Sequence, residues 1–296
     1  LTGCTNGITN QKTSNHMDTL NLTQEWDKKF PQSNKVNHRK VTFKNRYGIT
    51  LAADLYEPKN IESKVPAIAV SGPFGAVKEQ SSGLYAQTMA ERGFLTLAFD
   101  PSYTGESGGE PRNVASPDIN TEDFSAAVDF LIAHPNVDAK RIGIIGICGF
   151  GGMGLNAAAM DTRIKATVAS TMYDMSRVNA NGYFDAEDSA EVRRNKREAM
   201  NAIRTRDAQN GTATPGTPGL PTSIKGDEPQ FVKDYFDYYK TERAFHARAI
   251  NSNGAWNPTM ALSFINMPLL TYIHEIDNAC LLYTSPSPRD RRLPRM

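Results

Sequence analysis

The segment GICGFGG, residues 146–152, carries the chain's best candidate for a nucleophile, the thiol of Cys148. An apolar run precedes this segment and a run of small residues follows it, so Cys148 is expected at a sharp turn between a strand and a helix. Such a turn needs small neighbours, because strand, turn and helix must pack without collision, and the four glycines of the segment provide them. The N-terminus of the following helix is expected to lower the pKa of the thiol, which favours the reactive thiolate.

Attack of a thiolate on an acyl carbon generates an oxyanion, which acyl-transfer sites usually hold with two backbone N–H groups. The residue after the nucleophile, Gly149, is the first candidate donor. The second is expected in the loop SGPFGAVKEQ, residues 71–80, where Phe74 or Gly75 would point its N–H toward the thiol. Both segments follow apolar, strand-like runs, so they are expected at the carboxyl edge of a parallel sheet, where such folds bind ligands.

The general base that would activate this thiol is not evident from the sequence. Two histidines lie near the N-terminal polar run, one ends an expected helix, and two lie in later segments that favour surface or packing roles: His16, His38, His134, His246 and His274. Asp174 follows the strand-like run IKATVAST and is the candidate acid, although a hinge role at that position is the favoured interpretation. The chain is therefore expected to lack its general base.

Strand-like and helical patterns alternate through the middle of the chain. After a hairpin signal at residues 38–57, strand-like runs occur at PAIAVSG, FLTLAFD, RIGIIGIC and IKATVAST, with helical spacing between them. One of these helices is expected to start at Thr121, which acidic residues follow. The alternation predicts an α/β fold, a mostly parallel sheet with helices on both faces, with residues 38–172 as its core.

The alternation stops near residue 173, and residues 173–256 are expected to form a helical cap inserted into the core. They comprise a highly charged helical segment, a loop rich in Pro and Gly, and an aromatic-rich helix. Packing is the favoured role for the aromatic side chains of that helix, with substrate contact as the alternative: Tyr235, Phe236, Tyr238 and Tyr239. Residues 257–279 are expected to return to the core.

The composition favours a small-molecule substrate over a charged macromolecular partner. The 296 residues include 33 Lys and Arg and 32 Asp and Glu, a net charge of +1, which gives no electrostatic footprint for nucleic acid. No apolar run of the sequence approaches the roughly 20 residues that span a bilayer.

The N-terminal residues LTGC resemble a bacterial lipobox, which predicts that Cys4 is lipidated. Residues 1–37 would then be a lipobox remnant followed by a polar tether. In that case the protein is anchored to a membrane of the bacterial cell envelope and faces the periplasm or the outside. The alternative is that translation begins at Met17 and the protein is cytoplasmic.

The C-terminal residues 280–296 are rich in Pro and Arg, and CLLYTSPSPRD resembles the translation of a sequencing-library adapter. The natural reading frame is therefore expected to stop near Ala279, with the last strands of the fold missing and this chain inactive. With Cys280 assigned to the adapter and Cys4 to a lipid anchor, Cys148 is the remaining thiol, and no disulfide framework is expected.

Three motifs together resemble the α/β-hydrolase superfamily, and more narrowly the dienelactone-hydrolase-like bacterial hydrolases: RIGIIGICGFGG, SGPFGAVKEQ and AFDPSYTGESGGEP. The resemblance extends from the hairpin near Val41 to about Ile276. It implies that the Cys148 thiol, with the N–H donors named above, hydrolyses an ester, a lactone or a related small acyl compound. The resemblance implies no metal and no organic cofactor.

The sequence departs from this family pattern in two places. Phe150 stands where the superfamily has glycine, and its ring is a candidate wall of the substrate site, as is Tyr103 in the glycine-rich loop. The family takes its histidine, and commonly its acid, from loops after the last strands, and the sequence breaks off before them. Two alternatives therefore stay open: a peptidase or acyl-peptide hydrolase of the same fold, and a non-catalytic binding lipoprotein.

Overall fold

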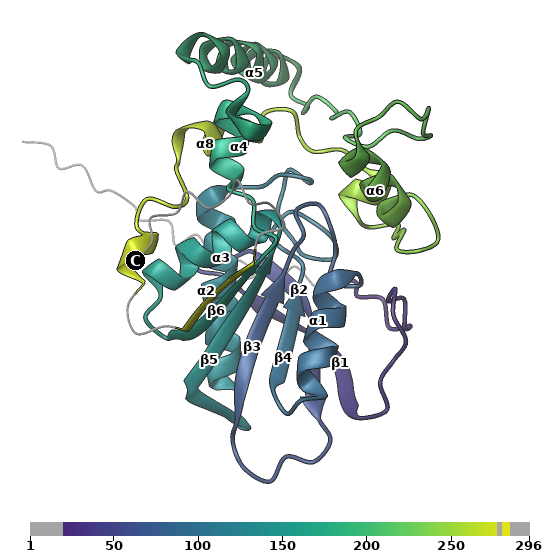
Figure 1. Ribbon diagram of the computed structural model, residues 1–296, viewed down its shortest axis with the longest axis vertical. Coiled ribbons are helices and arrows are strands. Elements are labelled where there is room, and N and C mark those ends of the chain that lie inside the picture. The colour runs from purple at the N-terminus through teal and green to yellow at the C-terminus, as the bar shows by residue number, and fades with distance from the viewer. Residues whose placement is uncertain (1–19, 277–279, 285–296) are drawn as a thin grey trace, which may run out of the picture.

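The computed structural model describes residues 20–276 and 280–284, and Figure 1 shows a twisted sheet with helices on both faces. The predictions that concern Cys4, His16 and Met17 lie outside these residues. Among the described helices, none is both long enough and apolar enough to cross a membrane.

The described residues form one sheet of seven strands in the order β1-β2-β4-β3-β5-β6-β7. β1 and β2 form the expected hairpin, β2 also runs antiparallel to β4, and the other neighbouring strands are parallel. This mostly parallel sheet confirms the predicted fold class. The strands are Val36–Lys44 (β1), Thr50–Pro58 (β2), Val65–Ser71 (β3), Leu95–Phe99 (β4), Val137–Ile147 (β5), Ile164–Ser170 (β6) and Cys280–Thr284 (β7).

Three helices pack on the sheet, and the remaining helices gather after β6. The packed helices are Ser81–Ala90 (α1), Pro117–Ala133 (α2) and Gly149–Met160 (α3). The later elements are Met175–Asn181 (α4), Tyr183–Asp185 (η1), Ala190–Asn210 (α5), Gln230–Tyr239 (α6), Ile250–Asn253 (α7), Ala261–Asn266 (α8) and Ile273–Glu275 (η2). Figure 1 shows α4, α5 and α6 beyond one end of the sheet. These helices fall within the range expected for the cap, whose role stays a prediction.

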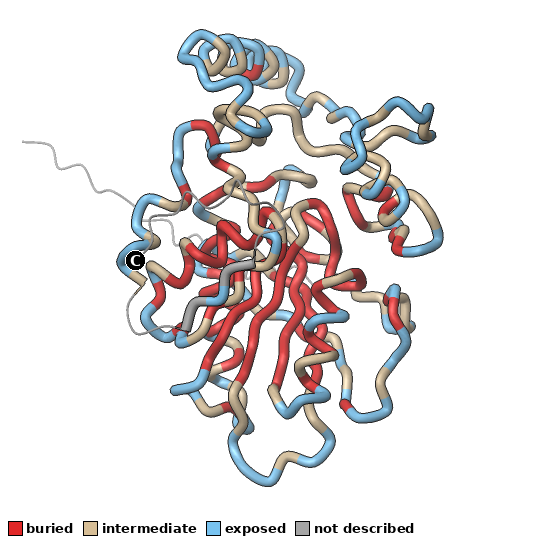
Figure 2. Tube along the Cα trace, in the orientation of Figure 1, coloured by how far each residue is buried: buried red, intermediate tan, exposed pale blue. Residues whose placement is uncertain are grey.

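The hydrophobic core is divided by the sheet. Ala67 and Ala69 of β3 belong to a large cluster with residues of α2 and α3, whereas Ile68 and Val70 pack in a smaller cluster with residues of α1. Because successive side chains of a strand point to opposite faces, the two clusters cover the two faces of the sheet. Covering both faces explains why the central strands are continuously apolar and, in Figure 2, almost continuously buried.

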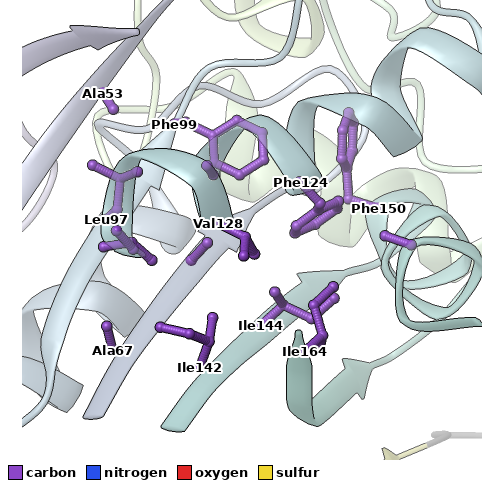
Figure 3. Close-up of a cluster of buried hydrophobic side chains, with 14 of the residues drawn as sticks. Ala53, Ala67, Leu97, Phe99, Phe124, Val128, Ile142, Ile144, Phe150 and Ile164 are labelled. Carbon is purple, nitrogen blue, oxygen red and sulfur yellow. The ribbon is translucent and has the colours of Figure 1, made fainter. Parts of the chain in front are cut away.

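An aromatic group lies at the centre of the larger cluster, where Figure 3 shows Phe99, Phe124 and Phe150 together. The ring centroids of Phe99 and Phe124 are 5.2 Å apart, and those of Phe124 and Phe150 are 6.3 Å apart. Each of the three side chains is at most 1% exposed. Burial of one such ring contributes about 1.5–3 kcal/mol to stability, so this group fixes how α2 and α3 sit on the sheet.

Helix α2 begins earlier than the sequence pattern predicted. The expected start was Thr121, but the helix starts at Pro117, and the Ser116 side chain accepts a hydrogen bond from the Ile119 N–H at 3.4 Å. Serine at the N-cap followed by proline in the first helical position is a strong start signal, because proline lacks the N–H that would be unpaired there. This signal outweighed the acidic residues that follow Thr121.

The last described strand, β7, pairs in parallel with β6, with Cys280 opposite Ala166 and Thr284 opposite Ser170. Its residues belong to the segment that resembles an adapter sequence. Pairing of the backbone does not depend on where a sequence comes from, so the adapter origin of residues 280–296 stays a prediction.

Candidate active site

Cys148 occupies the junction of β5 and α3 in a conformation that few residues with a side chain adopt, with φ 56° and ψ −125°. Its N–H donates to the Ser170 carbonyl of β6 at 2.9 Å. Its carbonyl accepts from the N–H groups of Gly151, at 2.9 Å, and Tyr173, at 3.0 Å. Three backbone hydrogen bonds therefore hold the strained residue in place, which is typical of functional positions.

The glycines beside Cys148 are required by close contacts. A Cβ atom at Gly146 would lie 2.3 Å from the carbonyl oxygen of Phe150, and one at Gly149 would lie 2.8 Å from the Phe74 Cβ. Contacts this short do not occur between real Cβ atoms and backbone or Cβ atoms. The two glycines thus allow the strand, the turn and the loop after β3 to converge on the thiol.

Two backbone N–H groups, those of Gly149 and Phe74, hydrogen bond the sulfur of Cys148. Both residues were expected as oxyanion donors. Of the two alternatives in the loop after β3, the structure brings the N–H of Phe74, not that of Gly75, to the thiol. Gly75 instead presents its carbonyl to the backbone N–H of Asn251, at 3.1 Å.

The thiol is not activated in the way that the sequence suggested. Burial raises the pKa of Cys148 above its usual value, and the hydrogen bonds from Gly149 and Phe74 lower it by less. The expectation that the helix N-terminus gives a net lowering was wrong, because the loss of hydration around the thiolate outweighs the two donors. Cys148 is therefore mostly protonated at neutral pH.

The loop that supplies Phe74 is fixed by a buried ion cluster around Lys78. The Lys78 ammonium lies 2.7 Å from Glu79 Oε1, 2.8 Å from Asp100 Oδ2 and 2.6 Å from Glu106 Oε2. In addition, the Lys78 N–H donates to Asp100 Oδ1 at 2.8 Å. The side chains of Lys78, Glu79 and Asp100 are 0% exposed and that of Glu106 is 4% exposed.

These opposite charges shift one another strongly. Burial lowers the pKa of Lys78, but the charges of Asp100 and Glu79 raise it well above its usual value. Burial raises the pKa of Glu106, whereas the charge of Lys78 and hydrogen bonds from Lys40 and Lys78 lower it to about 2. The three carboxylates lie close enough together to hold a metal ion, and the Lys78 ammonium is the cation that they surround.

Sequence reasoning missed this cluster. The sequence could have indicated it, because three charged residues lie next to segments expected to be buried. Lys78 and Glu79 lie in the loop that supplies the oxyanion donor, and Asp100 ends an expected buried strand. Charged residues next to buried strands are seldom fully buried unless they are paired.

The four described histidines each lie against a carboxylate away from the thiol. The Nε2 atoms are 2.7 Å, 3.3 Å, 3.6 Å and 3.9 Å from carboxylate oxygens in the pairs His38–Asp54, His134–Glu57, His246–Asp27 and His274–Glu275. The pKa of Cys148 responds to burial and to two backbone N–H groups. No described histidine therefore stands out as its base.

Asp174 caps helix α4. Its Oδ1 accepts hydrogen bonds from the N–H groups of Ser176, at 3.0 Å, and Arg177, at 3.1 Å. Burial raises the pKa of Asp174, and these two donors lower it by less. The carboxylate is thus engaged with the start of the helix that follows β6, and its role as a triad acid or as a hinge stays a prediction.

The two candidate substrate contacts are placed differently from the prediction. Phe150 is 1% exposed, and its ring packs against Phe74 and Phe124 in the core, so its proposed role as a pocket wall was wrong. Phe150 is the second residue of α3, and Figure 3 shows it beside Phe124 of α2. Tyr103 packs its ring against Gly109 within the loop after β4, and its role in substrate binding stays a prediction.

Aromatic side chains of the later helices approach the thiol. The pKa values of Tyr235 and Tyr239 are raised, first by burial and then by the nearby charge of Cys148. The pKa of Tyr183 is raised by burial, then by the charge of Tyr173 and then by that of Cys148. The rings of Tyr235 and Tyr239 are 6.3 Å apart, and Tyr239 is 5% exposed. Tyr239 therefore packs, as the sequence favoured, but it and Tyr235 also border the nucleophile.

A mostly parallel sheet, a strained cysteine between strand and helix, and a converging loop after β3 define the class of this protein as an α/β hydrolase. The model of the X-Pro dipeptidyl-peptidase (S15 family) matches residues 47–262, and the chain belongs to this family. The α/β hydrolase GrgF from Penicillium has the same fold, with a TM-score of 0.67 and 20% identity over 84% of this chain and 80% of that chain.

Two sequence relatives are similar to this chain over different lengths. The uncharacterized protein PA2218 of Pseudomonas aeruginosa is 62% identical over 280 residues, which are 93% of this chain and 75% of that protein. The crystal structure of PA2218 matches with a TM-score of 0.86, over 90% of this chain and 82% of that chain, at 64% identity. Thiohydrolase aneE of Aspergillus aculeatus is 33% identical over 132 residues, 45% of this chain and 41% of that protein.

Proposed function

We propose that this hydrolase cleaves an ester, lactone or thioester through covalent catalysis by Cys148. The observation that carries the proposal is the pair of backbone N–H groups, from Gly149 and Phe74, directed at the sulfur. When a carbonyl carbon bonds to that sulfur, its oxygen comes within reach of the same two donors. A pair of preorganised donors stabilises the negative charge that develops in this step.

In the first step, the Cys148 thiolate attacks the acyl carbon and the carbonyl π electrons move to oxygen. The oxyanion then collapses, the bond to the leaving group breaks, and the alkoxide or thiolate departs with the bonding electrons, leaving an acyl thioester on the enzyme. In the second step, water adds to the thioester carbonyl, the C–S bond breaks, and a carboxylic acid and the Cys148 thiol are released. We assign no base for the second step among the described residues, because their histidines are paired elsewhere.

The choice among acyl substrates follows from leaving-group chemistry. A thiolate or phenolate departs without prior protonation, whereas an amine requires a general acid at the site. No described histidine takes that position beside Cys148, so thioesters and aryl esters are the preferred substrates. The likeness to a thiohydrolase favours a thioester, and the dienelactone-hydrolase-like motifs favour an ester or lactone.

The test is pre-steady-state acylation. The full chain and its Cys148→Ala variant are mixed with p-nitrophenyl acetate and, separately, with a small acyl thioester, from about pH 7 to pH 10. We expect a burst of about one product molecule per wild-type molecule, growing with pH as the thiol ionises. We expect no burst from Cys148→Ala. Equal bursts from the two proteins, or none from either, would contradict the proposal.

A second candidate function is removal of X-Pro dipeptides, and the family match over residues 47–262 favours it. An X-Pro p-nitroanilide is the discriminating substrate. Cleavage of this anilide that depends on Cys148 and exceeds cleavage of the ester would favour the peptidase. If neither substrate acylates Cys148, a non-catalytic binding protein is favoured.

We further propose that Cys4 is lipidated and anchors the protein in the bacterial envelope, on the strength of the LTGC segment. Globomycin, which blocks processing of lipoprotein precursors, should then cause a larger precursor to accumulate. An unchanged band with globomycin would contradict the anchor and favour a start at Met17.

A further inference from the structure

The short helix α7, Ile250–Asn253, is hydrogen bonded to the loop that supplies one oxyanion donor. The Asn251 side-chain amide donates to the Phe74 carbonyl at 2.8 Å, and the Asn251 backbone N–H donates to the Gly75 carbonyl at 3.1 Å. One residue therefore holds two successive peptide groups, directly after the N–H that faces Cys148. The Phe74 carbonyl lies in the planar peptide group between Phe74 and Gly75, so fixing this carbonyl holds that whole plane. Holding the plane limits rotation about the backbone bonds of Phe74, on whose other side the N–H lies.

The fit between Asn251 and the loop leaves no room for a side chain on Gly75. A Cβ atom there would lie 2.4 Å from Asn251 Oδ1, and the φ of Gly75 is +83°, in the region that favours glycine. This close approach brings the amide of Asn251 into hydrogen-bond range of the Phe74 carbonyl. The loop and α7 thus fit each other at both carbonyls and at the glycine between them.

Asn251 is also bound from the side of the later helices. Its amide hydrogen bonds the hydroxyl of Tyr239, at the end of α6. Tyr239 is 5% exposed and lies close enough to Cys148 to respond to its charge. The side chain of Asn251 thus connects three groups around the nucleophile: the donor loop, the end of α6 and, through Tyr239, the surroundings of the thiol.

Gln80, the last residue of the donor loop, contacts the same segment, and a further hydrogen bond joins two residues within that segment. The Gln80 amide donates to the Ala244 carbonyl at 2.7 Å and is 3.4 Å from the Ser252 hydroxyl, and the Lys240 ammonium donates to the Ser252 carbonyl at 2.8 Å. Residues 239–253 and the loop after β3 therefore form one connected unit. Displacement of this segment would release the carbonyls that orient the Phe74 peptide.

We propose that Asn251 is a positioning residue that orients the Phe74 N–H toward Cys148, and that its hydrogen bond to the Tyr239 hydroxyl orients Asn251 in turn. This role rests on the proposed function for its effect on catalysis, but the orientation of the N–H toward the thiol can be measured without any turnover. Asn251 touches neither the sulfur nor the acyl group in this proposal. It acts through the Phe74 peptide.

The experiment compares Asn251→Ala with Asn253→Ala, which makes the same change two residues further along α7 at an exposed position. Asn251→Leu, close in shape to asparagine, serves as the second variant. The pH profile of Cys148 alkylation by iodoacetamide is followed by mass spectrometry of the Cys148 peptide. Alkylation at carbon forms no oxyanion, so its midpoint reports the thiol pKa and its plateau reports access to the sulfur.

Loss of the Phe74 hydrogen bond should move the alkylation midpoint of both Asn251 variants upward by about half a pH unit or more, with an unchanged plateau. Asn253→Ala should match the wild type. In the same proteins, the acylation rate with p-nitrophenyl acetate at its plateau pH should fall about 10-fold for the Asn251 variants, less than the 10²–10³ that follows loss of a whole donor. Tyr239→Phe should lower the acylation rate about 2-fold. The double variant Asn251→Ala/Tyr239→Phe should acylate no more slowly than Asn251→Ala, because both changes remove the same hydrogen bond between Asn251 and Tyr239.

The outcomes separate the two proposals. Unchanged midpoints in both Asn251 variants would overturn the positioning role, whether or not the wild type acylates. A fall in the alkylation plateau equal to the fall in acylation would overturn it as well, because Asn251 would then govern access to the sulfur. Shifted midpoints in a wild-type background that gives no acylation burst would support the positioning role and overturn the proposed function alone.

Discussion

Replacement of Lys78 by methionine should destabilise the protein strongly at neutral pH. The substitution keeps much of the side-chain volume but removes the ammonium that lies within 2.8 Å of Glu79, Asp100 and Glu106. Three carboxylates would then face one another in the interior with Lys40 and Arg248 as their nearest remaining cations. Breaking one buried pair by removing a partner costs about 3–5 kcal/mol, and Lys78 has three partners.

The pH dependence gives this prediction its sharpest form. The pKa of Glu106 is lowered from 4.5 to about 2 in the folded protein, which corresponds to about 3 kcal/mol of stability. A lowered pKa stabilises the folded state above the unfolded value, so this contribution is complete above about pH 5 and is lost as the pH falls to about 2. Lys78→Met should lose this contribution, because the Lys78 charge is the main cause of the lowering.

Urea denaturation followed by circular dichroism at pH 7 and at pH 3 provides the measurement. We expect the gap in unfolding free energy between wild type and Lys78→Met to be at least about 3 kcal/mol at pH 7 and clearly smaller at pH 3. Lys64→Met, at an exposed position before β3, is the control and should change stability by less than about 0.5 kcal/mol. A gap that is small at pH 7, or that does not shrink toward pH 3, would refute the role assigned to the cluster.

Three further predictions concern the elbow. Phe150→Ala should lower the free energy of unfolding by about 3–5 kcal/mol, because a ring that is 1% exposed leaves a cavity, and thermal denaturation would check this. Gly146→Ala should yield little folded protein, since its Cβ would lie 2.3 Å from the Phe150 carbonyl oxygen. The soluble yield beside that of Gly219→Ala, an exposed control with open space around its Cβ, would reveal the loss. Iodoacetamide alkylation of Cys148 should have its pH midpoint above the pKa of about 8.5 of a free cysteine, because burial raises the pKa of this thiol. A midpoint below that value would show that the two N–H donors outweigh burial.

The sheet and the elbow could be predicted because both depend on local patterns. Strands buried on both faces appear as continuous apolar runs, such as the one that became β4, Leu95–Phe99. The turn at Cys148 requires small neighbours within a few residues, so glycines mark it in the sequence. For the same reason, Gly149 and Phe74 could be proposed as donors from their places after two strands.

The rest of the site depends on contacts between distant segments, which no local pattern records. Asn251 meets Phe74 across 177 residues, and the Lys78 ammonium meets Glu106 across 28. Phe150 was misplaced for a related reason, because which way a residue in the first turn of a helix points depends on how that helix sits on the sheet. The pKa of Cys148 was misjudged because a helix N-terminus is visible in a sequence, whereas the depth of burial is not.

The raised pKa of the Cys148 thiol bears on how the protein withstands oxidants. Hydrogen peroxide reacts with thiolates much faster than with thiols, so a cysteine that stays protonated at neutral pH and is half-buried is oxidised slowly. The burial that slows the first chemical step at low pH thus also protects the sulfur from conversion to sulfenic and sulfinic acids. A protonated nucleophile thus attacks the acyl carbon more slowly, but it is also oxidised more slowly and stays competent for longer.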